Sequence, residues 1–76
     1  MRHLSDLQIG QHGIIVALPS RGAVRNKLIA LGLLPGVTVK MLRLAPLGDP
    51  MQIQIRGSSL SIRRSDATEV RIKETT

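Results

Sequence analysis

Ligands for a divalent metal ion are the first chemistry to consider, because the chain contains two histidines and five acidic residues. His3 and Asp6 are close enough in sequence to approach each other on one turn, and imidazole with carboxylates suits a divalent transition metal. The other candidates, His12, Asp49 and Asp66, are scattered along the chain, so no ligand cluster with recognisable spacing appears. We therefore predict no metal site and no cofactor.

Catalytic motifs are also missing from the sequence. No Ser, His and Asp arrangement places a nucleophile beside a base, and no glycine-rich loop precedes a Lys and a Ser or Thr. Arg21, in an expected loop over residues 19–22, could supply charge to a partner's nucleotide hydrolysis. Any loop of a basic protein offers such an arginine. We predict no catalytic residue and no enzyme activity.

The net charge and the lack of aromatic residues limit the classes of partner that the chain can bind. Eleven Lys and Arg against five Asp and Glu give a formal net charge of +6, which attracts nucleic acid, acidic protein surfaces or anionic lipid. The chain has no Phe, Trp or Tyr, so it lacks the stacking platform of single-strand binders and the aromatic groove that reads proline-rich peptides. We expect no nucleic-acid partner, with phosphate contacts from strand arginines left as the alternative.

Length and hydropathy define the class of protein. A chain of 76 residues has room for a single domain, residues 1–76, with a small core. Cysteine is absent, so no disulfide supplements that core. No apolar run approaches the roughly 20 residues of a membrane span, and the N-terminus has no hydrophobic targeting segment. We predict a cytoplasmic protein that is not embedded in the membrane.

One helix and one tight turn are the most distinct elements. Val24, Leu28 and Leu31 form an apolar stripe that predicts a helix over residues 23–31. Gly32 can close that helix in the left-handed conformation, and residues 35–36 fit a type II turn. Between these two fixed points, at least one of the leucines at 33 and 34 should enter the core.

Short strands account for most of the remaining chain. Residues 13–18 predict a strand buried largely on both faces. Period-two alternation predicts further strands over residues 37–44, 51–56, 59–63 and 69–73, with a break in the alternation of the first of them. A break in alternation at residues 42–44 predicts a bulge, residues 46–50 a loop, and residues 64–67 one helical turn. The fold class is therefore mainly β, a small, partly open barrel of five strands with one helix after the first strand. The predicted core is Leu28, Leu31, Val39, Ile53, Ile55, Leu60, Ile62, Val70 and Ile72.

A protein-docking surface is the functional feature that the residues favour most. Ile29 lies off the apolar stripe, only one of Leu33 and Leu34 need be buried, and nothing local obliges Leu47 to be inside. Basic side chains around such a patch would suit an acidic, partly apolar partner. The candidate partner-binding residues are Arg21, Arg25, Lys27, Ile29, Leu33, Leu34 and Leu47.

Motifs along nearly the whole chain resemble one known family. They are Leu4-x-x-Leu7-x-x-Gly10, residues 28–36, Gly48-Asp49-Pro50, Gly57, residues 60–63, Ala67, Val70 and Ile72. Each piece is ordinary turn and strand chemistry, but their order and spacing are similar to the bacterial ferrous-iron transport protein A (FeoA) family of SH3-like barrels.

The resemblance implies an accessory or regulatory protein of ferrous-iron transport. Its implied partner is a membrane ferrous-iron transporter with a cytoplasmic G-protein domain. The same barrel occurs in iron-dependent repressors, so a basic nucleic-acid-binding or repressor-type barrel is the alternative. Edge strands of an open barrel could also pair between copies, giving a weak homo-oligomer.

Overall fold

The alternating segments of the sequence form six strands of one antiparallel sheet in the computed structural model, which describes residues 2–75. Within this part of the chain, no helix is long and apolar enough to cross a membrane. The elements are β1 (Arg2–His3), the 3-10 helix η1 (Leu4–Asp6), β2 (His12–Ala17), α1 (Ala23–Ala30), β3 (Thr38–Leu44), η2 (Pro46–Gly48), β4 (Met51–Ile55), β5 (Ser58–Ile62), α2 (Arg64–Ala67) and β6 (Arg71–Glu74).

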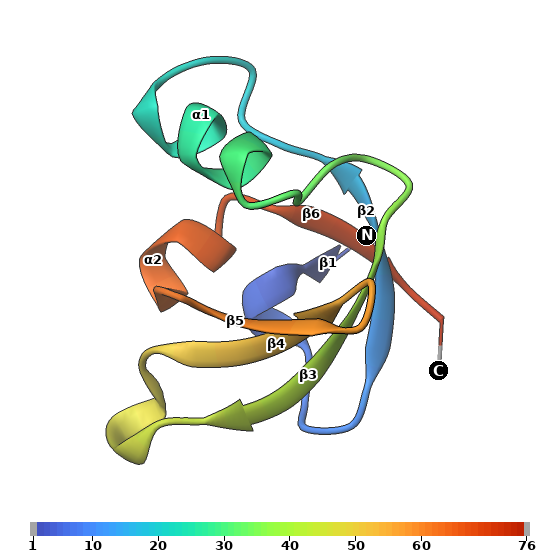
Figure 1. Ribbon diagram of the computed structural model, residues 1–76, viewed down its shortest axis with the longest axis vertical. Coiled ribbons are helices and arrows are strands. Elements are labelled where there is room, and N and C mark those ends of the chain that lie inside the picture. Colours follow the sequence, from blue (N-terminus) through green and yellow to red (C-terminus); the bar gives the residue numbers. More distant parts are fainter. Residues whose placement is uncertain (1, 76) are drawn as a thin grey trace.

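The strands follow the order β1-β6-β2-β3-β4-β5, and every neighbouring pair is antiparallel. The sheet curls around a common interior, with α1 at one end of the molecule and the β3–β4 connection that contains η2 at the other (Figure 1). The prediction of five strands was one too few. Arg2 and His3 pair with Ile72 and Arg71 of β6, but two residues are too short to show an alternating pattern.

Smaller predictions met mixed outcomes. The predicted bulge is confirmed by a register shift between Met41 and Arg43, and the predicted helical turn is α2. The first predicted strand is not buried on both faces, because Val16 is exposed while Ile15 is buried. The predicted loop after β3 contains the single turn η2, in which the proline occupies the first helical position.

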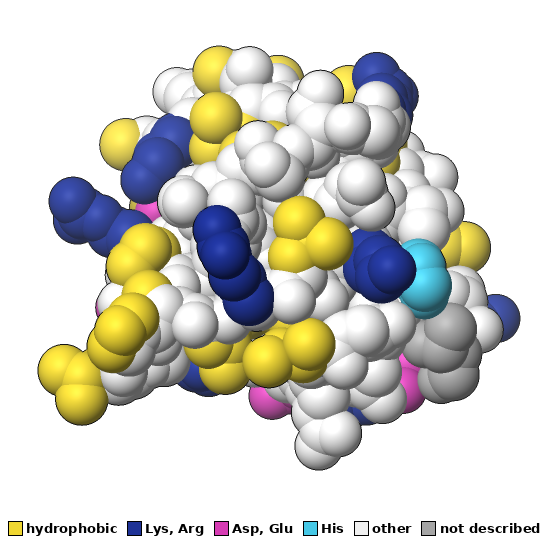
Figure 2. Space-filling model, turned by 60° about the horizontal axis from the view of Figure 1, so that its bottom comes forward, with side chains coloured by type: hydrophobic (Ala, Val, Ile, Leu, Met, Phe, Trp, Pro, Cys, Tyr) yellow, Lys and Arg dark blue, Asp and Glu magenta, His cyan; other side chains and the backbone are white. Residues whose placement is uncertain are grey.

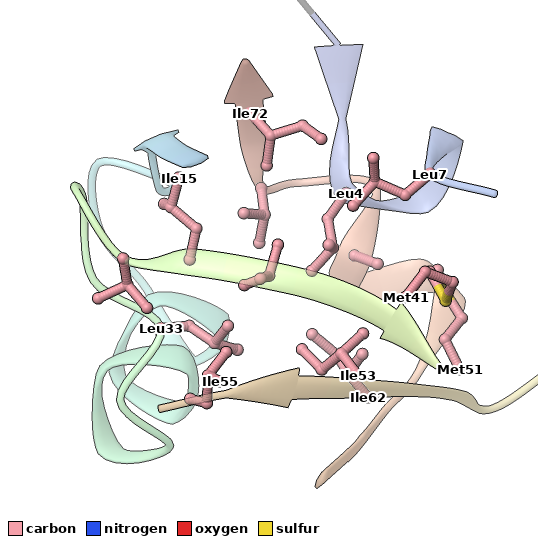
Figure 3. Packing of buried hydrophobic residues seen from close by; sticks show 14 of the residues in the cluster. Leu4, Leu7, Ile15, Leu33, Met41, Met51, Ile53, Ile55, Ile62 and Ile72 are labelled. Atoms are coloured by element: carbon pink, nitrogen blue, oxygen red, sulfur yellow. The ribbon is translucent and has the colours of Figure 1, made fainter. Parts of the chain in front are cut away.

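A compact aliphatic core fills the interior of the curled sheet (Figure 3). Seven of the nine predicted core residues are fully or nearly fully buried, while Leu31 and Leu60 are partly buried and pack against the cluster. The buried cluster is Leu4, Leu7, Ile15, Leu28, Leu33, Val37, Val39, Met41, Met51, Ile53, Ile55, Ile62, Ala67, Val70 and Ile72.

The end of α1 is closed by a Schellman motif that links the helix to the core. The amide of Leu33 donates to the carbonyl of Leu28 at 3.0 Å, and the amide of Gly32 donates to the carbonyl of Ile29 at 3.0 Å. Gly32 has a φ of +90°, as this motif requires. The motif brings the side chains of Leu28 and Leu33 to the same side, and both are fully buried. The predicted tight turn follows, closed by a 3.1 Å bond from the Val37 amide to the Leu34 carbonyl.

An ion pair joins the two helices. Lys27 Nζ of α1 lies 2.8 Å from Asp66 Oδ2 of α2. The Asp66 side chain is only 13% exposed, whereas that of Lys27 is 49% exposed, so the carboxylate depends on the lysine for compensation of its lost hydration. This contact ties α1 to α2, two elements far apart in the sequence.

We expect Gly32→Ala to lower the free energy of unfolding by about 1–2 kcal/mol, because a Cβ is disfavoured at positive φ. The added atom would meet only Ile55 Cδ1 at 3.6 Å, an ordinary contact, so the loss would come from the backbone. Gly32→Asn should cost less, because asparagine tolerates the left-handed region. Urea unfolding measures both values, and equal losses for Ala and Asn would contradict this explanation.

We expect Lys27→Met to destabilise the protein by about 1 kcal/mol, because it keeps the aliphatic stem but leaves the Asp66 carboxylate partly buried without its cation. Lys73→Met removes the same charge from an exposed position on β6 and should change stability much less. Thermal denaturation of the two variants makes the comparison, and similar losses would show that the ion pair contributes nothing specific.

Candidate functional site

The end of the molecule that carries α1 presents part of the predicted docking surface. Ile29 and Leu34 are 38% and 36% exposed; Ile29 lies within the Schellman motif and Leu34 directly follows it. Arg21 is exposed in the segment that leads into α1. We call Arg21, Ile29 and Leu34 the α1-end surface. The motif explains why these leucine and isoleucine side chains face outward, since their neighbours Leu28 and Leu33 are turned into the core.

Two of the predicted basic residues have structural partners. The Arg25 guanidinium donates to the carbonyl of Pro19 at 3.0 Å, which fixes the segment that enters α1. Lys27 is engaged with Asp66. Both residues therefore shape the α1 end as well as adding positive charge to it.

The remaining two predicted residues do not join this surface. Leu33 is fully buried, so its inclusion in an exposed patch was wrong; its burial follows from the hydrogen bond to Leu28. Leu47 is exposed, as predicted, but it belongs to η2, at the end of the molecule opposite α1 (Figure 1). The single patch expected from the sequence is thus divided between two ends of the barrel.

The η2 loop that carries Leu47 is held by the side chain of Arg64. The Nε and Nη2 atoms of Arg64 donate to the carbonyl of Gly48 at 3.3 and 3.2 Å, and Nη1 donates to the carbonyl of Ser5 at 3.4 Å. The Arg64 amide donates to Asp49 Oδ1 at 3.0 Å. One residue at the start of α2 thereby holds the C-terminal side of the loop and also contacts η1, and the sequence offered no sign of this role.

Further apolar side chains lie at this same end. Ile9 and Leu44 are exposed, and backbone bonds join the Ile9 loop to β3, from the Gly10 amide to the Met41 carbonyl at 2.8 Å and from the Met41 amide to the Gln11 carbonyl at 3.0 Å. We call Ile9, Leu44 and Leu47 the η2-end surface. On the face in Figure 2, hydrophobic side chains alternate with Lys and Arg side chains.

A shallow groove of about 340 Å³ lies beside the η2 loop. Its polar lining comes from the outer face of β3, β4 and β5, and its apolar lining from both ends of the loop. The lining residues are Arg43, Leu44, Ala45, Pro46, Pro50, Gln52 and Ser61.

The sequence analysis did not include Ile9 and Leu44 among the exposed apolar residues. Two signals were available: Ile9 precedes a turn glycine, and Leu44 follows the bulge.

The residues considered as metal ligands lie apart, with one exception. His3 Nδ1 and Asp6 Oδ2 approach to 3.9 Å on the first turn, as their spacing indicates. Asp49 and Asp66 are engaged with Arg64 and Lys27 instead. Among residues 2–75, no group of three or more His, Cys, Asp or Glu side chains could hold a metal ion.

A comparison with protein families matches residues 2–74 to the FeoA domain. A curated relative, the Fe(2+) transport protein A/Fe(2+) transporter FeoB fusion protein of Porphyromonas gingivalis, is 33% identical over 70 residues. That match covers 92% of this chain and 8% of the fusion protein, so the chain spans only a small part of its relative.

Solved structures share the fold. A FeoA-like protein from Clostridium acetobutylicum superposes with a TM-score of 0.93 at 27% identity, over 99% of this chain and 87% of that one. FeoA of Stenotrophomonas maltophilia, an SH3 domain protein solved with zinc, gives 0.77 at 25% identity, over 96% and 91%. The predicted SH3-like class is thereby confirmed.

The repressor-type alternative is supported only at the level of fold. A manganese-dependent transcriptional repressor reaches a TM-score of 0.88 at 11% identity, over 97% of this chain and 41% of the repressor. The match of residues 2–74 to the FeoA domain identifies a family, whereas the likeness to the repressor concerns the fold alone. The match to the FeoA domain also agrees with the prediction of a non-enzymatic protein. Another structural relative in this family is an iron uptake regulatory protein. The chain belongs to the FeoA domain family.

Proposed function

We propose that this chain is an accessory protein of bacterial ferrous-iron transport that docks on the cytoplasmic G-protein region of a membrane iron transporter. The observation that carries the proposal is the Porphyromonas gingivalis fusion, in which a region similar to this chain is joined to a Fe(2+) transporter. Fusion keeps two units at a high effective concentration, which is useful when they contact each other. Wherever the two units are separate polypeptides, the FeoA-like unit needs its own docking surface.

The α1-end surface suits this docking. Ile29 and Leu34 offer exposed apolar area on a rigid helix-to-turn segment, so little conformational entropy is lost when a partner covers them. The exposed Arg21, which precedes α1, and the net charge of +6 favour an acidic partner. Small, partly apolar surfaces of this kind are typical of transient regulatory contacts.

The action of the protein on its partner is a shift of populations. A subunit that binds one nucleotide state of the G-protein region more tightly stabilises that state by its difference in affinity. No bond is made or broken by this chain itself. Its effect on transport then depends on which state it prefers.

The experiment that tests the proposal is biolayer interferometry against the isolated cytoplasmic region of the transporter. Binding is measured without nucleotide, with GDP and with a GTP analogue, each at two salt concentrations. We expect binding that differs among the three states and weakens at higher salt. Absence of binding in all three states would contradict the proposed partner, and binding to generic DNA at physiological salt would favour the nucleic-acid alternative.

Substitutions locate the surface. We expect Ile29→Ser with Leu34→Ser to weaken binding about tenfold, mainly through faster dissociation, because an apolar contact is lost. Arg21→Glu should mainly slow association, because it reverses a charge at the rim. Lys27 is unsuitable for charge reversal, since a glutamate there would face Asp66. Leu44→Ser at the other end is the matched control, and an equal loss in that variant would place the contact elsewhere.

A further inference from the structure

We propose that the η2-end surface is a peripheral membrane contact, in which Leu47 enters the headgroup region of an anionic bilayer and neighbouring arginines contact lipid phosphates. This inference concerns the end of the barrel opposite the docking surface, and it does not depend on the identity of the transporter. It rests on the exposure and conformation of Leu47, on the fixed shape of its loop, and on the charges around it.

Leu47 has an unfavourable backbone conformation that is not compensated by burial of its side chain. Its side chain is 104% exposed, so it contributes no burial to the described core. Its φ of +71° lies in the left-handed region, where a residue with a Cβ is disfavoured by about 1–2 kcal/mol and glycine or asparagine is preferred. A large apolar side chain at such a position has no role in packing, and its chemistry points to an apolar environment outside the chain.

The loop presents this side chain in a fixed position. The 2.8 Å bond from the Gly48 amide to the Ala45 carbonyl joins the backbone on the two sides of Leu47, and the bonds from Arg64 to the Gly48 carbonyl hold the C-terminal side of the loop. A preorganised loop loses little conformational entropy when its tip becomes buried. The projection is therefore a built feature of the fold.

The shape of this end fits a bilayer. Leu47 projects outward, with Leu44 and Ile9 exposed beside β3. A projecting side chain needs a complementary pocket to bind a protein, whereas the headgroup region of a bilayer accommodates it without a preformed cavity. Exposed prolines at both ends of the loop, Pro46 and Pro50, extend the apolar area.

The charges around the loop favour an anionic surface. Arg43 is the next-to-last residue of β3 and donates to neutral Gln52, so its charge has no carboxylate against it there. Arg63 is exposed and follows Ile62, which pairs with Met51, so it lies beside the C-terminal end of the loop. The Arg64 guanidinium donates to carbonyl groups only, and Asp49 is the acidic residue of the loop. Positive charge thus exceeds negative charge around Leu47, as anionic headgroups require.

The test is flotation of the full chain with lipid vesicles, made of phosphatidylcholine alone or of phosphatidylcholine with phosphatidylglycerol. We expect binding to the anionic vesicles and little to the neutral ones, with a marked loss at high salt. Binding that is equal on both vesicles, or absent from the anionic ones, would overturn the proposal.

Variants separate insertion from general attraction. Leu47→Asn should reduce the partition coefficient about tenfold, because an inserted leucine is lost. Arg43→Gln with Arg63→Gln should reduce it by about fivefold for each charge. Leu34→Asn and Arg21→Gln, at the α1 end, are the matched controls and should bind as the original chain does. Equal losses in the controls would show that only net charge and general hydrophobicity act.

The thermal stability of Leu47→Asn tests the conformational argument independently of lipid binding. Asparagine tolerates positive φ, so this variant should unfold at the same or a higher temperature while binding vesicles less. A lower melting temperature would contradict the argument from conformation. Sedimentation velocity tests the alternative that this surface binds a second copy of the chain. If Leu47→Asn abolishes self-association and leaves vesicle binding intact, the surface is a contact between two copies and the lipid proposal fails.

Discussion

The turn that follows α1 is the constraint on which the rest of this small barrel depends. A chain without aromatic residues must fill its core with aliphatic side chains of moderate size, so few of them can be spared. The backbone bonds around Gly32 turn Leu28 and Leu33 inward together and direct the chain into β3. The same geometry leaves Ile29 and Leu34 outside, so folding and surface presentation are settled by one local motif.

The two ends of the barrel carry different kinds of surface. At the α1 end, apolar side chains of moderate exposure lie on a segment fixed by the Schellman motif and by the contacts of Arg25 and Lys27. At the η2 end, a fully exposed leucine lies on a loop that follows β3, where Arg43 donates to neutral Gln52. If both proposed contacts form together, they restrict the orientation of this domain relative to the transporter and the lipid surface.

Local patterns in the sequence predicted the helix α1, the turn at residues 35–36, the helical turn at residues 64–67, the bulge and most of the core. These features depend on the spacing of apolar residues and on the positions of glycine and proline. The first strand was missed because pairing of Arg2 and His3 with β6 is a long-range contact with no local signature. The docking residues were predicted as exposed apolar positions with basic residues around them, but their grouping into one patch failed. Leu47 is separated from Ile29 by the path of the chain through the barrel, and Leu33 is buried by a hydrogen bond that only the folded turn makes.

The pairing of β1 with β6 gives the domain a particular modularity. Arg2 lies opposite Ile72 and His3 opposite Arg71, so the first strand of the domain lies beside its last strand. A polypeptide that runs into β1 and out of β6 can therefore carry this barrel as an insertion or as an added unit, without passing any segment through the core. The joining of a similar region to a transporter in one polypeptide is a rearrangement that this geometry makes structurally simple.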